Sequence, residues 1–471
     1  MLKSRIMSNS FVGRENELKK IETFLNKRGF FGCLLYGRRR IGKSELIKNA
    51  IKDRKEFVVY YEAKQTTEQN NVDGLTELIC ETLKVDYIHF DSLEATLEYL
   101  FKFSIKNDLI LVIDEYSYLI KMINGLDSIL QNLIDKYKDA SKMKLIISGS
   151  FIDMMKDLLE YHNPLYGRFD LIINLKQMDY YDSSKFYNNF SDVDKIKMYS
   201  VCGGVPYYNK LIDDNLSVKE NIINIIASND SRLENEIQVY LKSEIQKINN
   251  ANEIFETLAK GYSRPIDIIN QSSIKSGPLL IEILNKLISM ELVEKQSPIN
   301  DENNKKKTGY YIIDNLSSFY YKYIYRYNSQ FKVMSSIAFY DKYINDDFEN
   351  EYVPKKFEDI CKQFLIKKNI NNNIAPPFFK IGKYYYDLPK QKINGEFDIV
   401  TEDEKGYVFY EVKFRKNKMK LSDIEKEISQ VNATSLNCYK YGFFSAAGFE
   451  DGIKDVIKYT LNDLYSVREF N

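Results

Sequence analysis

Residues 37–44, with the sequence GRRRIGKS, combine two glycines with a lysine and a serine at a spacing suited to phosphate binding. Gly37 and Gly42 let the backbone turn so that its N–H groups converge on phosphate oxygens. Lys43 can reach the β- and γ-phosphates, and the Ser44 hydroxyl can be a ligand of Mg²⁺. We therefore expect this segment, called the phosphate loop below, to bind ATP with Mg²⁺. The expected nucleotide contacts within and just after it are Gly37, Arg38, Arg39, Arg40, Ile41, Gly42, Lys43, Ser44 and Glu45.

Two adjacent acids, Asp114 and Glu115, follow the apolar run LILVI at 109–113. Such a run is typical of a strand in a parallel sheet that is covered on both faces. Neighbouring carboxylates repel each other unless a cation is near, and Mg²⁺ bound with ATP is such a cation. We expect Asp114 to hold the metal through water and Glu115 to polarise the attacking water. Without a phosphate loop in the same chain, Asp114 and Glu115 would more often be the cap of a helix. Because the phosphate loop is present, we favour the role in metal binding and catalysis.

A third apolar run, KLIISGS at 144–150, ends in Ser148 and Ser150. Either hydroxyl can sense a γ-phosphate, and we assign the nucleotide contact to Ser148. Serines at strand ends are also ordinary turn formers, so a purely structural role stays open.

Near the C-terminus, GEFDIV (395–400) and YVFYEVKF (407–414) flank a polar turn and predict an antiparallel hairpin. If the turn centres on 404–405, Asp398 stands opposite Glu411, where like charges destabilise a sheet. Two carboxylates so placed favour a divalent cation. Asp398 and Glu411 are therefore candidate metal ligands.

The second of these strands also carries Lys413, two residues after Glu411 and on the same face. Both faces of the strand begin apolar, so we expect these charges to be partly buried and to need partners. The run KFRKNKMK at 413–420 is the strongest local basic cluster, which suits a nucleic-acid backbone or, equally, a solvated helix entry.

Short apolar runs separated by helical stretches predict an open α/β parallel sheet, and this sheet would position the residues named above. The five expected strands cover residues 33–36, 56–63, 109–113, 144–150 and 170–175.

In order along the chain, FVGRENEL, GRRRIGKSEL, LILVIDE, IISGS, PLYGRF and GGVPYY resemble the archaeal-type AAA ATPases of prokaryotes, which are related to the STAND signal-transducing NTPases. The resemblance implies that Phe11, Val12 and Gly13 lie near the adenine, with Arg14 bracing them. It also makes Arg168 a candidate contact to the γ-phosphate, within the chain or across a subunit boundary of a homo-oligomer. A structural salt bridge is the alternative for Arg168.

The same resemblance implies four parts: a P-loop ATPase core (1–175), a helical lid (176–245), a winged helix (246–316) and a C-terminal domain (317–471). In the lid, CGGVP at 202–206 must interrupt the helices and is expected near the nucleotide. The winged-helix pattern is three helices closed by a hairpin. Its loop holds Lys305–Lys307, where the lysines could meet phosphate or form a solvated loop, since winged helices also serve as protein–protein modules.

The C-terminal pattern D…E-x-K resembles the restriction-endonuclease-like fold. The resemblance implies that Asp398, Glu411 and Lys413 gather Mg²⁺ and activate a water for phosphodiester hydrolysis, with Glu358 as the glutamate of a helix. The proline that begins the motif in that family is Phe397 here. Alternatively, Glu411–Lys413 or Asp398–Lys413 is an ion pair in an inert or merely DNA-binding fold.

Composition limits the remaining possibilities. The net charge is zero, so a nucleic-acid partner would have to meet a local basic patch. Two histidines and five scattered cysteines argue against histidine-based catalysis, a disulfide framework and a zinc module. The absence of a long apolar run predicts a protein that does not enter a membrane, and we expect it in the cytoplasm.

Three functions fit this reading. The first is an ATP-hydrolysing switch coupled to a C-terminal domain that binds nucleic acid, with DNA cleavage by that domain left open. The second is an ATP-gated, Mg²⁺-dependent nuclease. The third is a signalling adaptor with a catalytically inactive nuclease-like domain and a protein partner.

Overall fold

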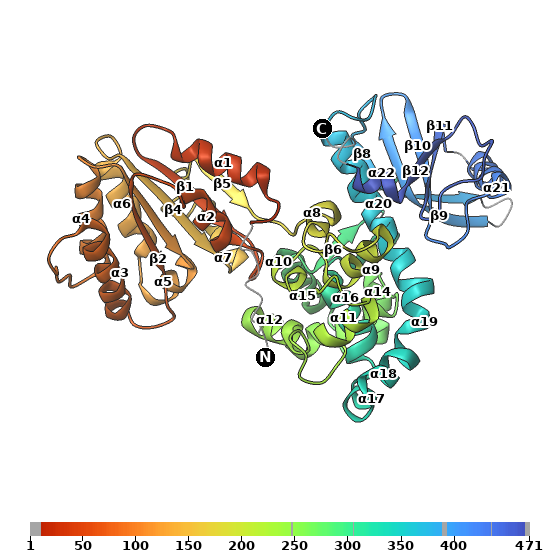
Figure 1. Cartoon of the computed structure of the whole chain (residues 1–471), viewed down its shortest axis with the longest axis horizontal. Coiled ribbons are helices and arrows are strands. Elements are labelled where there is room, and N and C mark those ends of the chain that lie inside the picture. Colours follow the sequence, from red (N-terminus) through yellow and green to blue (C-terminus); the bar gives the residue numbers. More distant parts are fainter. Residues whose placement is uncertain (1–10, 246–247, 305, 389–392, 435, 467–471) are drawn as a thin grey trace. The chain divides into compact units, whose positions relative to one another are not determined.

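The structure, a computed structural model, describes residues 11–245, 248–304, 306–388, 393–434 and 436–466 (Figure 1). The chain forms two compact units, and each is described by itself. The first unit is residues 1–177 with 205–207, and the second is residues 178–204 with 208–471. Among the described residues, none of the helices is both long enough and apolar enough to cross a bilayer. All five cysteines are free thiols.

The first unit is built on a parallel sheet with the strand order β2-β3-β4-β1-β5. Every side chain of β3, with the sequence LILVID, is buried, because helices cover both faces of the sheet. The predicted α/β parallel sheet is thereby confirmed. Its strands are β1 (Phe31–Tyr36), β2 (Phe57–Glu62), β3 (Leu109–Asp114), β4 (Met143–Gly149) and β5 (Leu171–Asn174).

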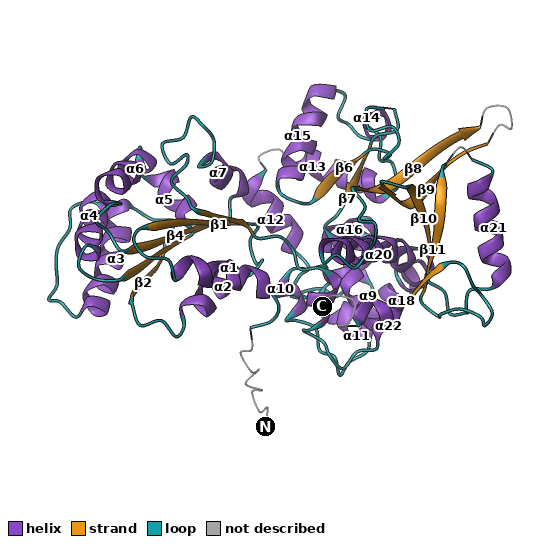
Figure 2. Cartoon of the chain, turned by 90° about the horizontal axis from the view of Figure 1, so that it is seen from above, coloured by secondary structure: helices purple, strands orange, loops and turns teal. Residues whose placement is uncertain are grey.

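Two layers of helices enclose this sheet. Figure 2 shows α5 and α6 on one side of the sheet and α1 and α2 on the other. A buried cluster of this unit packs α3, α4, α5 and α6 against β1, β2, β3 and β4. The helices are α1 (Glu15–Leu25), α2 (Lys43–Ile51), α3 (Glu68–Leu83), α4 (Leu93–Ser104), α5 (Tyr116–Met122), α6 (Leu126–Tyr137) and α7 (Ile152–Asp157).

The second unit begins with helices, as predicted, and Gly203 and Gly204 interrupt them. A Cβ on Gly204 would lie 1.8 Å from the Met178 carbonyl oxygen, so only glycine allows this approach. The next segment has three helices and an antiparallel hairpin, and prolines stand in the first turns of α14 and α15. These elements are α8 (Tyr180–Ser184), α9 (Asp192–Cys202), α10 (Pro206–Asn209), α11 (Val218–Ile225), α12 (Glu236–Glu244), α13 (Ile248–Ala259), α14 (Pro265–Gln271), α15 (Gly277–Ser289), β6 (Val293–Gln296) and β7 (Gly309–Ile312).

The rest of the second unit is a helical stretch followed by a mixed sheet with the order β12-β11-β10-β9-β8. Neighbours β8, β9 and β10 are antiparallel, whereas β10, β11 and β12 are parallel. The helices are α16 (Asn315–Phe319), the π-helix η1 (Tyr320–Tyr325), α17 (Asn328–Val333), α18 (Ser336–Tyr343), α19 (Asn345–Asp347), the π-helix η2 (Phe348–Tyr352), α20 (Val353–Ile370), α21 (Leu421–Asn432) and α22 (Leu461–Tyr465). The strands are β8 (Lys380–Leu388), β9 (Ile393–Asp403), β10 (Gly406–Lys413), β11 (Cys438–Ser445) and β12 (Ile457–Thr460).

Candidate functional site

The phosphate loop leaves the end of β1 and enters α2, and two of its positions require glycine. A Cβ on Gly37 would lie 2.4 Å from the Leu175 carbonyl oxygen. Gly42 has φ +94°, a left-handed conformation that other residues adopt only with strain, and it caps α2. The N–H groups of the first turn of α2 therefore stand beside the loop, which is a favourable place for phosphate.

Lys43 lies inside the phosphate loop and is only 5% exposed. Its ammonium donates hydrogen bonds to the carbonyl oxygens of Gly37, at 2.9 Å, and Arg38, at 3.2 Å. Burial lowers the pKa of Lys43, while the charges of Glu115 and Asp114 act to raise it. Lys43 is thus a buried cation whose partners are main-chain carbonyls, and phosphate oxygens are stronger acceptors for it.

Asp114, at the end of β3, receives three hydroxyl groups. Ser44 Oγ donates to Asp114 Oδ2 at 2.6 Å, Tyr60 donates to the same oxygen at 2.5 Å, and Ser148 donates to Oδ1. Burial alone would raise the pKa of Asp114, but the hydrogen bonds from Ser148, Ser44 and Tyr60 lower it below its ordinary value. The carboxylate is therefore ionised and fixed in orientation.

Mg²⁺ fits the residues present at this point. Mg²⁺ takes oxygen ligands and is usually held by one or two protein groups together with substrate phosphates. The Ser44 hydroxyl and the Asp114 carboxylate are such ligands, and their hydrogen bond brings them together at the mouth of the loop. Tyr60 was not predicted as part of the site; it reaches Asp114 from β2, the strand that pairs with β3.

Glu115 follows directly and has φ 54° and ψ 40°, a left-handed conformation that is uncommon for a glutamate. Its Oε2 accepts hydrogen bonds from Ser150 Oγ at 2.8 Å and from the Ser150 amide at 3.2 Å. Both serines at the end of β4 therefore contact an acid: Ser148 holds Asp114 and Ser150 holds Glu115. Backbone strain of this kind is often found where a side chain is aimed at a reaction.

The remaining predicted contacts surround the loop. Arg14 donates to the carbonyl oxygens of Ile41, at 3.4 Å, and Lys176, at 2.5 Å, so the segment holding Phe11, Val12 and Gly13 runs beside the loop. Arg38 is almost fully buried. Arg39 donates to the Tyr118 hydroxyl at 3.0 Å, and Glu45 is exposed on the first turn of α2.

The GGVPYY turn also reaches the loop. Arg40 lies over the Tyr207 ring, 4.3 Å from its centroid, and Pro206 Cγ would be 3.7 Å from a Cβ on Gly42. Residues 205–207 accordingly belong to the first unit, although the residues on both sides of them belong to the second.

Arg168 is not brought to the phosphate loop. It pairs with Asp135 Oδ2 at 2.8 Å and also donates to the Tyr166 carbonyl oxygen. A Cβ on Gly32, at the start of β1, would lie 2.6 Å from the Arg168 carbonyl oxygen. The phosphate loop follows the carboxyl end of β1, about 13 Å further along the strand. Arg168 therefore lies near the opposite, amino-terminal ends of the strands. A contact across a subunit boundary remains a prediction.

In the C-terminal sheet, the β9–β10 hairpin has the predicted register. Gly406 pairs with Asp403 and Tyr410 with Ile399, so the next pair along the strands is Glu411 with Asp398. Asp398 is about half exposed and lies 3.6 Å from Lys383. Glu411 contacts Lys413, which lies 3.3 Å from Glu427 of α21. The structural ion pair left open for Glu411 and Lys413 is therefore present.

Glu358 of α20 faces the same place. Burial and then the charge of Asp398 raise the pKa of Glu358 to about 8, and burial also raises the pKa of Glu411 although Lys413 opposes this. Within the described ranges, no group of three or more Asp, Glu, His or Cys side chains is arranged to hold a metal ion. Metal binding by Asp398 and Glu411 stays a prediction. We call the group formed by Glu358, Asp398, Glu411, Lys413 and Glu427 the acid–lysine cluster.

The loop between β6 and β7 is not a free wing tip. The Ile299 amide donates to the Lys383 carbonyl oxygen at 2.8 Å, and the Asn300 side chain exchanges two hydrogen bonds with the backbone of Tyr385. Lys307 lies over the Tyr385 ring, 3.6 Å from its centroid. The loop thus covers the edge strand β8; Lys305 lies outside the described residues.

Comparison with solved structures agrees with this fold. The Walker-type ATPase Paby2304 of Pyrococcus abyssi matches with a TM-score of 0.51 and 18% identity over 68% of this chain and 99% of that protein. The ORC2 protein of Aeropyrum pernix, in ADPNP–ADP complexes, has a TM-score of 0.45 and 13% identity over 70% of this chain and 96% of its own. The first match supports the parallel-sheet ATPase fold.

Sequence comparison identifies two regions and one relative. Residues 11–212 match an ATPase domain found predominantly in Archaea, and residues 320–427 match a family described as archaeal and bacterial proteins of unknown function. The uncharacterized protein MJECL04 of Methanocaldococcus jannaschii is 30% identical over 424 residues, which are 88% of this chain and 90% of that protein. The chain therefore belongs to an archaeal-type ATPase family and is an ATP-hydrolysing enzyme.

Proposed function

We propose that the chain is an ATP-driven switch in which occupation of the phosphate loop changes the turn at 203–207, and through it the second unit. The single observation that carries this proposal is the turn itself. Residues 205–207 contact the loop, but they connect α9 to the helices that follow, in the second unit. A phosphate that displaces Lys43 from the carbonyls of Gly37 and Arg38 must alter the loop, and Pro206 and Tyr207 lie against that loop.

Within the ATPase site, different residues bind the phosphates, hold the metal and orient the water. The loop amides and Lys43 bind the phosphates, and Ser44 with Asp114 would hold Mg²⁺, which supplies positive charge to the phosphoryl group. Tyr60 and Ser148 keep the Asp114 carboxylate oriented. Glu115, held by Ser150, accepts a hydrogen bond from the attacking water and orients it.

Hydrogen exchange at the turn tests the switch. We expect ATP with Mg²⁺ to change the exchange of amides 203–208 and of the ends of α9 and α11 in the wild type, and to have no effect in Lys43→Ala. Tyr207→Ala should bind ATP within about threefold of wild type but lose the exchange change in α11. ATP turnover with unchanged exchange at 203–208 would remove the proposal.

For the second unit we propose nucleic-acid binding. The support is the exposed basic run directly after Lys413, which comprises Arg415, Lys416, Lys418 and Lys420. Electrostatic binding to a phosphate backbone weakens steeply with salt, so affinity for single- and double-stranded DNA should fall at least tenfold from 50 to 200 mM salt. Changing Arg415 and Lys416 to Gln should weaken it further. Binding that is absent at low salt favours the third function, an adaptor for a protein partner.

A second candidate function is Mg²⁺-dependent cleavage at the acid–lysine cluster. The observation that favours it is the hairpin register, which pairs the strands as far as Tyr410–Ile399, next to Glu411 and Asp398, and the charge of Asp398 acts on Glu411. Asp398→Ala or Lys413→Ala should abolish DNA cleavage while ATP hydrolysis continues. If the wild type with Mg²⁺ or Mn²⁺ cuts no form of DNA or RNA, the cluster is structural.

A further inference from the structure

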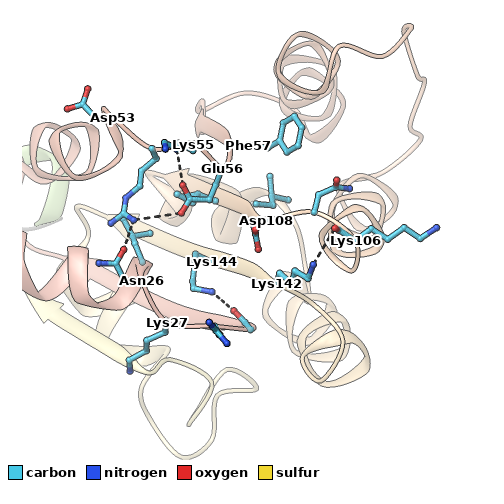
Figure 3. Close-up of a pocket in the computed structure, with 17 residues that line it drawn as sticks. Asn26, Lys27, Asp53, Lys55, Glu56, Phe57, Lys106, Asp108, Lys142 and Lys144 are labelled. Carbon is cyan, nitrogen blue, oxygen red and sulfur yellow. Dashed lines mark hydrogen bonds and ion pairs between the residues drawn. The ribbon is translucent and has the colours of Figure 1, made fainter.

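A basic cavity of about 920 Å³ lies at the amino-terminal ends of the parallel strands, whereas the phosphate loop lies at their carboxyl ends. Its lining includes the residues that precede or begin β2, β3 and β4, and the turn between α1 and β1. Figure 3 shows this lining. The volume is within the range of small-molecule sites in proteins. The cavity and the phosphate loop are separated by the length of a strand, so one ligand of nucleotide size cannot fill both.

Cations dominate the cavity wall. Seven of the seventeen lining residues are Lys or Arg and three are Asp or Glu, which leaves four positive charges in excess. Several of these cations follow helices: Arg28 follows α1, Arg54 and Lys55 follow α2, and Lys106 follows α4. Basic side chains are favourable at helix carboxyl ends without any ligand, because the helix dipole attracts them. That explanation covers these side chains and gives no reason to infer a site.

Lys144 is different, because it lies on β4 and not at a helix end. It is 5% exposed, and its ammonium donates to the Gly29 carbonyl oxygen, with the Phe31 ring 5.4 Å away. In the described part of the chain, Lys144 forms no ion pair within 4.0 Å. Burial lowers the pKa of Lys144, and Asp108 and Glu56 oppose this only from a greater distance.

A buried ammonium without a nearby carboxylate is costly, because the charge has left water without gaining a counter-ion. It has three N–H donors, and the structure gives it one carbonyl acceptor. In Figure 3 Lys144 lies among the lining side chains and is joined to a main-chain oxygen, that of Gly29. Lys142 donates to the Lys106 carbonyl oxygen at 3.4 Å, and Arg54 bonds to Asn26 and lies 3.7 Å from Glu56. An anion in the cavity would give Lys144 the missing charge.

We infer that this cavity binds a compact oligophosphate anion, with Lys144 at its floor and Arg54 and Lys142 beside it. Oligophosphates carry several negative charges and many acceptor oxygens in a small volume, which suits four excess cations around one cavity. Two sources supply such an anion, the phosphate chain of a nucleotide and an inorganic oligophosphate, and Phe57 distinguishes the two. Its ring lines the cavity, is 39% exposed and is packed edge-on against Phe103, so it can stack a base.

Calorimetry with sodium tripolyphosphate tests the inference in a Lys43→Ala background, which disables the phosphate loop. We expect saturable binding of one tripolyphosphate per chain. Adding Lys144→Met should weaken it at least tenfold, whereas Lys144→Arg should retain most of it. Lys52→Met, which removes an exposed cation just after α2 and outside the cavity, is the matched control. No saturable binding, or binding that Lys144→Met leaves unchanged, overturns the inference.

Further measurements keep the test decisive. Removing a buried charge that lacks a counter-ion should raise the melting temperature of Lys144→Met without ligand, so a loss of binding would not reflect unfolding. If Lys144→Met does not fold, Arg54→Gln with Lys142→Gln should weaken binding several-fold. Phe57→Ala should weaken ATP but not tripolyphosphate if the ligand is a nucleotide, and neither if it is inorganic. An oligodeoxythymidylate that binds this cavity when tripolyphosphate does not would overturn the inference in favour of a nucleic-acid backbone.

Discussion

The phosphate-loop site and the acid–lysine cluster both gather carboxylates, but they stabilise them in opposite ways. Asp114 is held by three neutral hydroxyl groups, those of Ser44, Tyr60 and Ser148. In the cluster, by contrast, Glu411 is paired with Lys413, and Asp398 lies near Lys383. Hydroxyl donors orient a carboxylate without cancelling its charge, whereas a lysine cancels it.

This difference decides how much each site gains from a metal ion. The Asp114 carboxylate has a lowered pKa and keeps its full negative charge, so Mg²⁺ adds a cation where one is needed. Glu411 already has a cation, and Glu358 has a pKa of about 8 and is mostly protonated at neutral pH. The first site is organised for metal and nucleotide, whereas the second can remain stable as an ion-pair network.

The largest effect is expected at Glu115. Glu115→Gln keeps the size of the side chain and its contact with Ser150 but removes the charge that orients the water. ATP turnover should fall at least about 100-fold. Nucleotide affinity, measured by fluorescence titration, should stay within about threefold, because Glu115 does not bind phosphate.

The control is Glu62→Gln, the exposed residue of β2 paired in register with Asp114. It should keep the wild-type rate within about twofold. Turnover that survives in Glu115→Gln would show that Glu115 does not orient the attacking water and that its contact with Ser150 is structural.

Local patterns predicted the first site well. Gly37, Gly42, Lys43 and Ser44 are consecutive or nearly so, and the same chain segment that shows the motif also builds the loop. Apolar runs predicted all five parallel strands. The three inner strands β1, β3 and β4 are buried almost throughout, as expected for strands covered on both faces, whereas the edge strands β2 and β5 are partly exposed. The register of the β9–β10 hairpin, from Gly406–Asp403 to Tyr410–Ile399, also followed from sequence, since one tight turn sets the register of a hairpin.

Contacts between distant segments could not be predicted. Tyr60 reaches Asp114 only because β2 lies beside β3, and no local pattern distinguishes it from the adjacent Tyr61, which bonds to Asn71. Arg168 was assigned by resemblance, but its position depends on how the segment before β5 meets the start of β1. The loop expected at a free wing tip instead covers β8, a contact between residues about 85 positions apart.

At the acid–lysine cluster, stability should depend on pH. The pKa of Glu358 is about 8 in the folded chain, above its ordinary value of 4.5. The folded state therefore holds this proton more tightly than the unfolded state. The protonated carboxyl group makes its full contribution to the free energy of unfolding below about pH 4.5. This contribution is lost as the pH rises through 8, at up to about 1.4 kcal/mol per pH unit.

Glu358→Gln cannot ionise, so its free energy of unfolding should rise relative to wild type between pH 5 and 8. Urea denaturation at several pH values measures this, with exposed Glu351→Gln as the control. Parallel curves for Glu358→Gln and wild type would contradict the raised pKa. Mg²⁺ sharpens the comparison: if it flattens the wild-type curve, the cluster binds the metal despite its lysine.

A smaller effect is expected at Tyr60. Tyr60→Phe removes one of three hydroxyl donors to Asp114, and two remain. The Mg²⁺ concentration for half-maximal ATP turnover should rise about three- to tenfold, because a hydrogen bond to a charged group is lost. Tyr61→Phe is the matched control, since its hydroxyl bonds to Asn71 away from the site. Equal Mg²⁺ dependence in the two variants would mean that Ser44 and Ser148 suffice to orient the carboxylate.

The smallest effect concerns the loop that covers β8 beside the acid–lysine cluster. Asn300 donates to the Tyr385 carbonyl oxygen at 2.8 Å and accepts from its amide at 3.1 Å, so Asn300→Ala removes both bonds at a partly exposed edge. We expect a loss of about 1 kcal/mol in the local protection of the Tyr385 amide, measured by hydrogen exchange. Asn303→Ala, exposed in the same loop, should leave that amide unchanged. Lys383 belongs to the covered strand and also lies near Asp398. Faster exchange that spreads to β9 would therefore mean that the loop helps to hold the cluster in its ion-paired form. Unchanged protection of the Tyr385 amide in Asn300→Ala would mean that β8 does not depend on the loop.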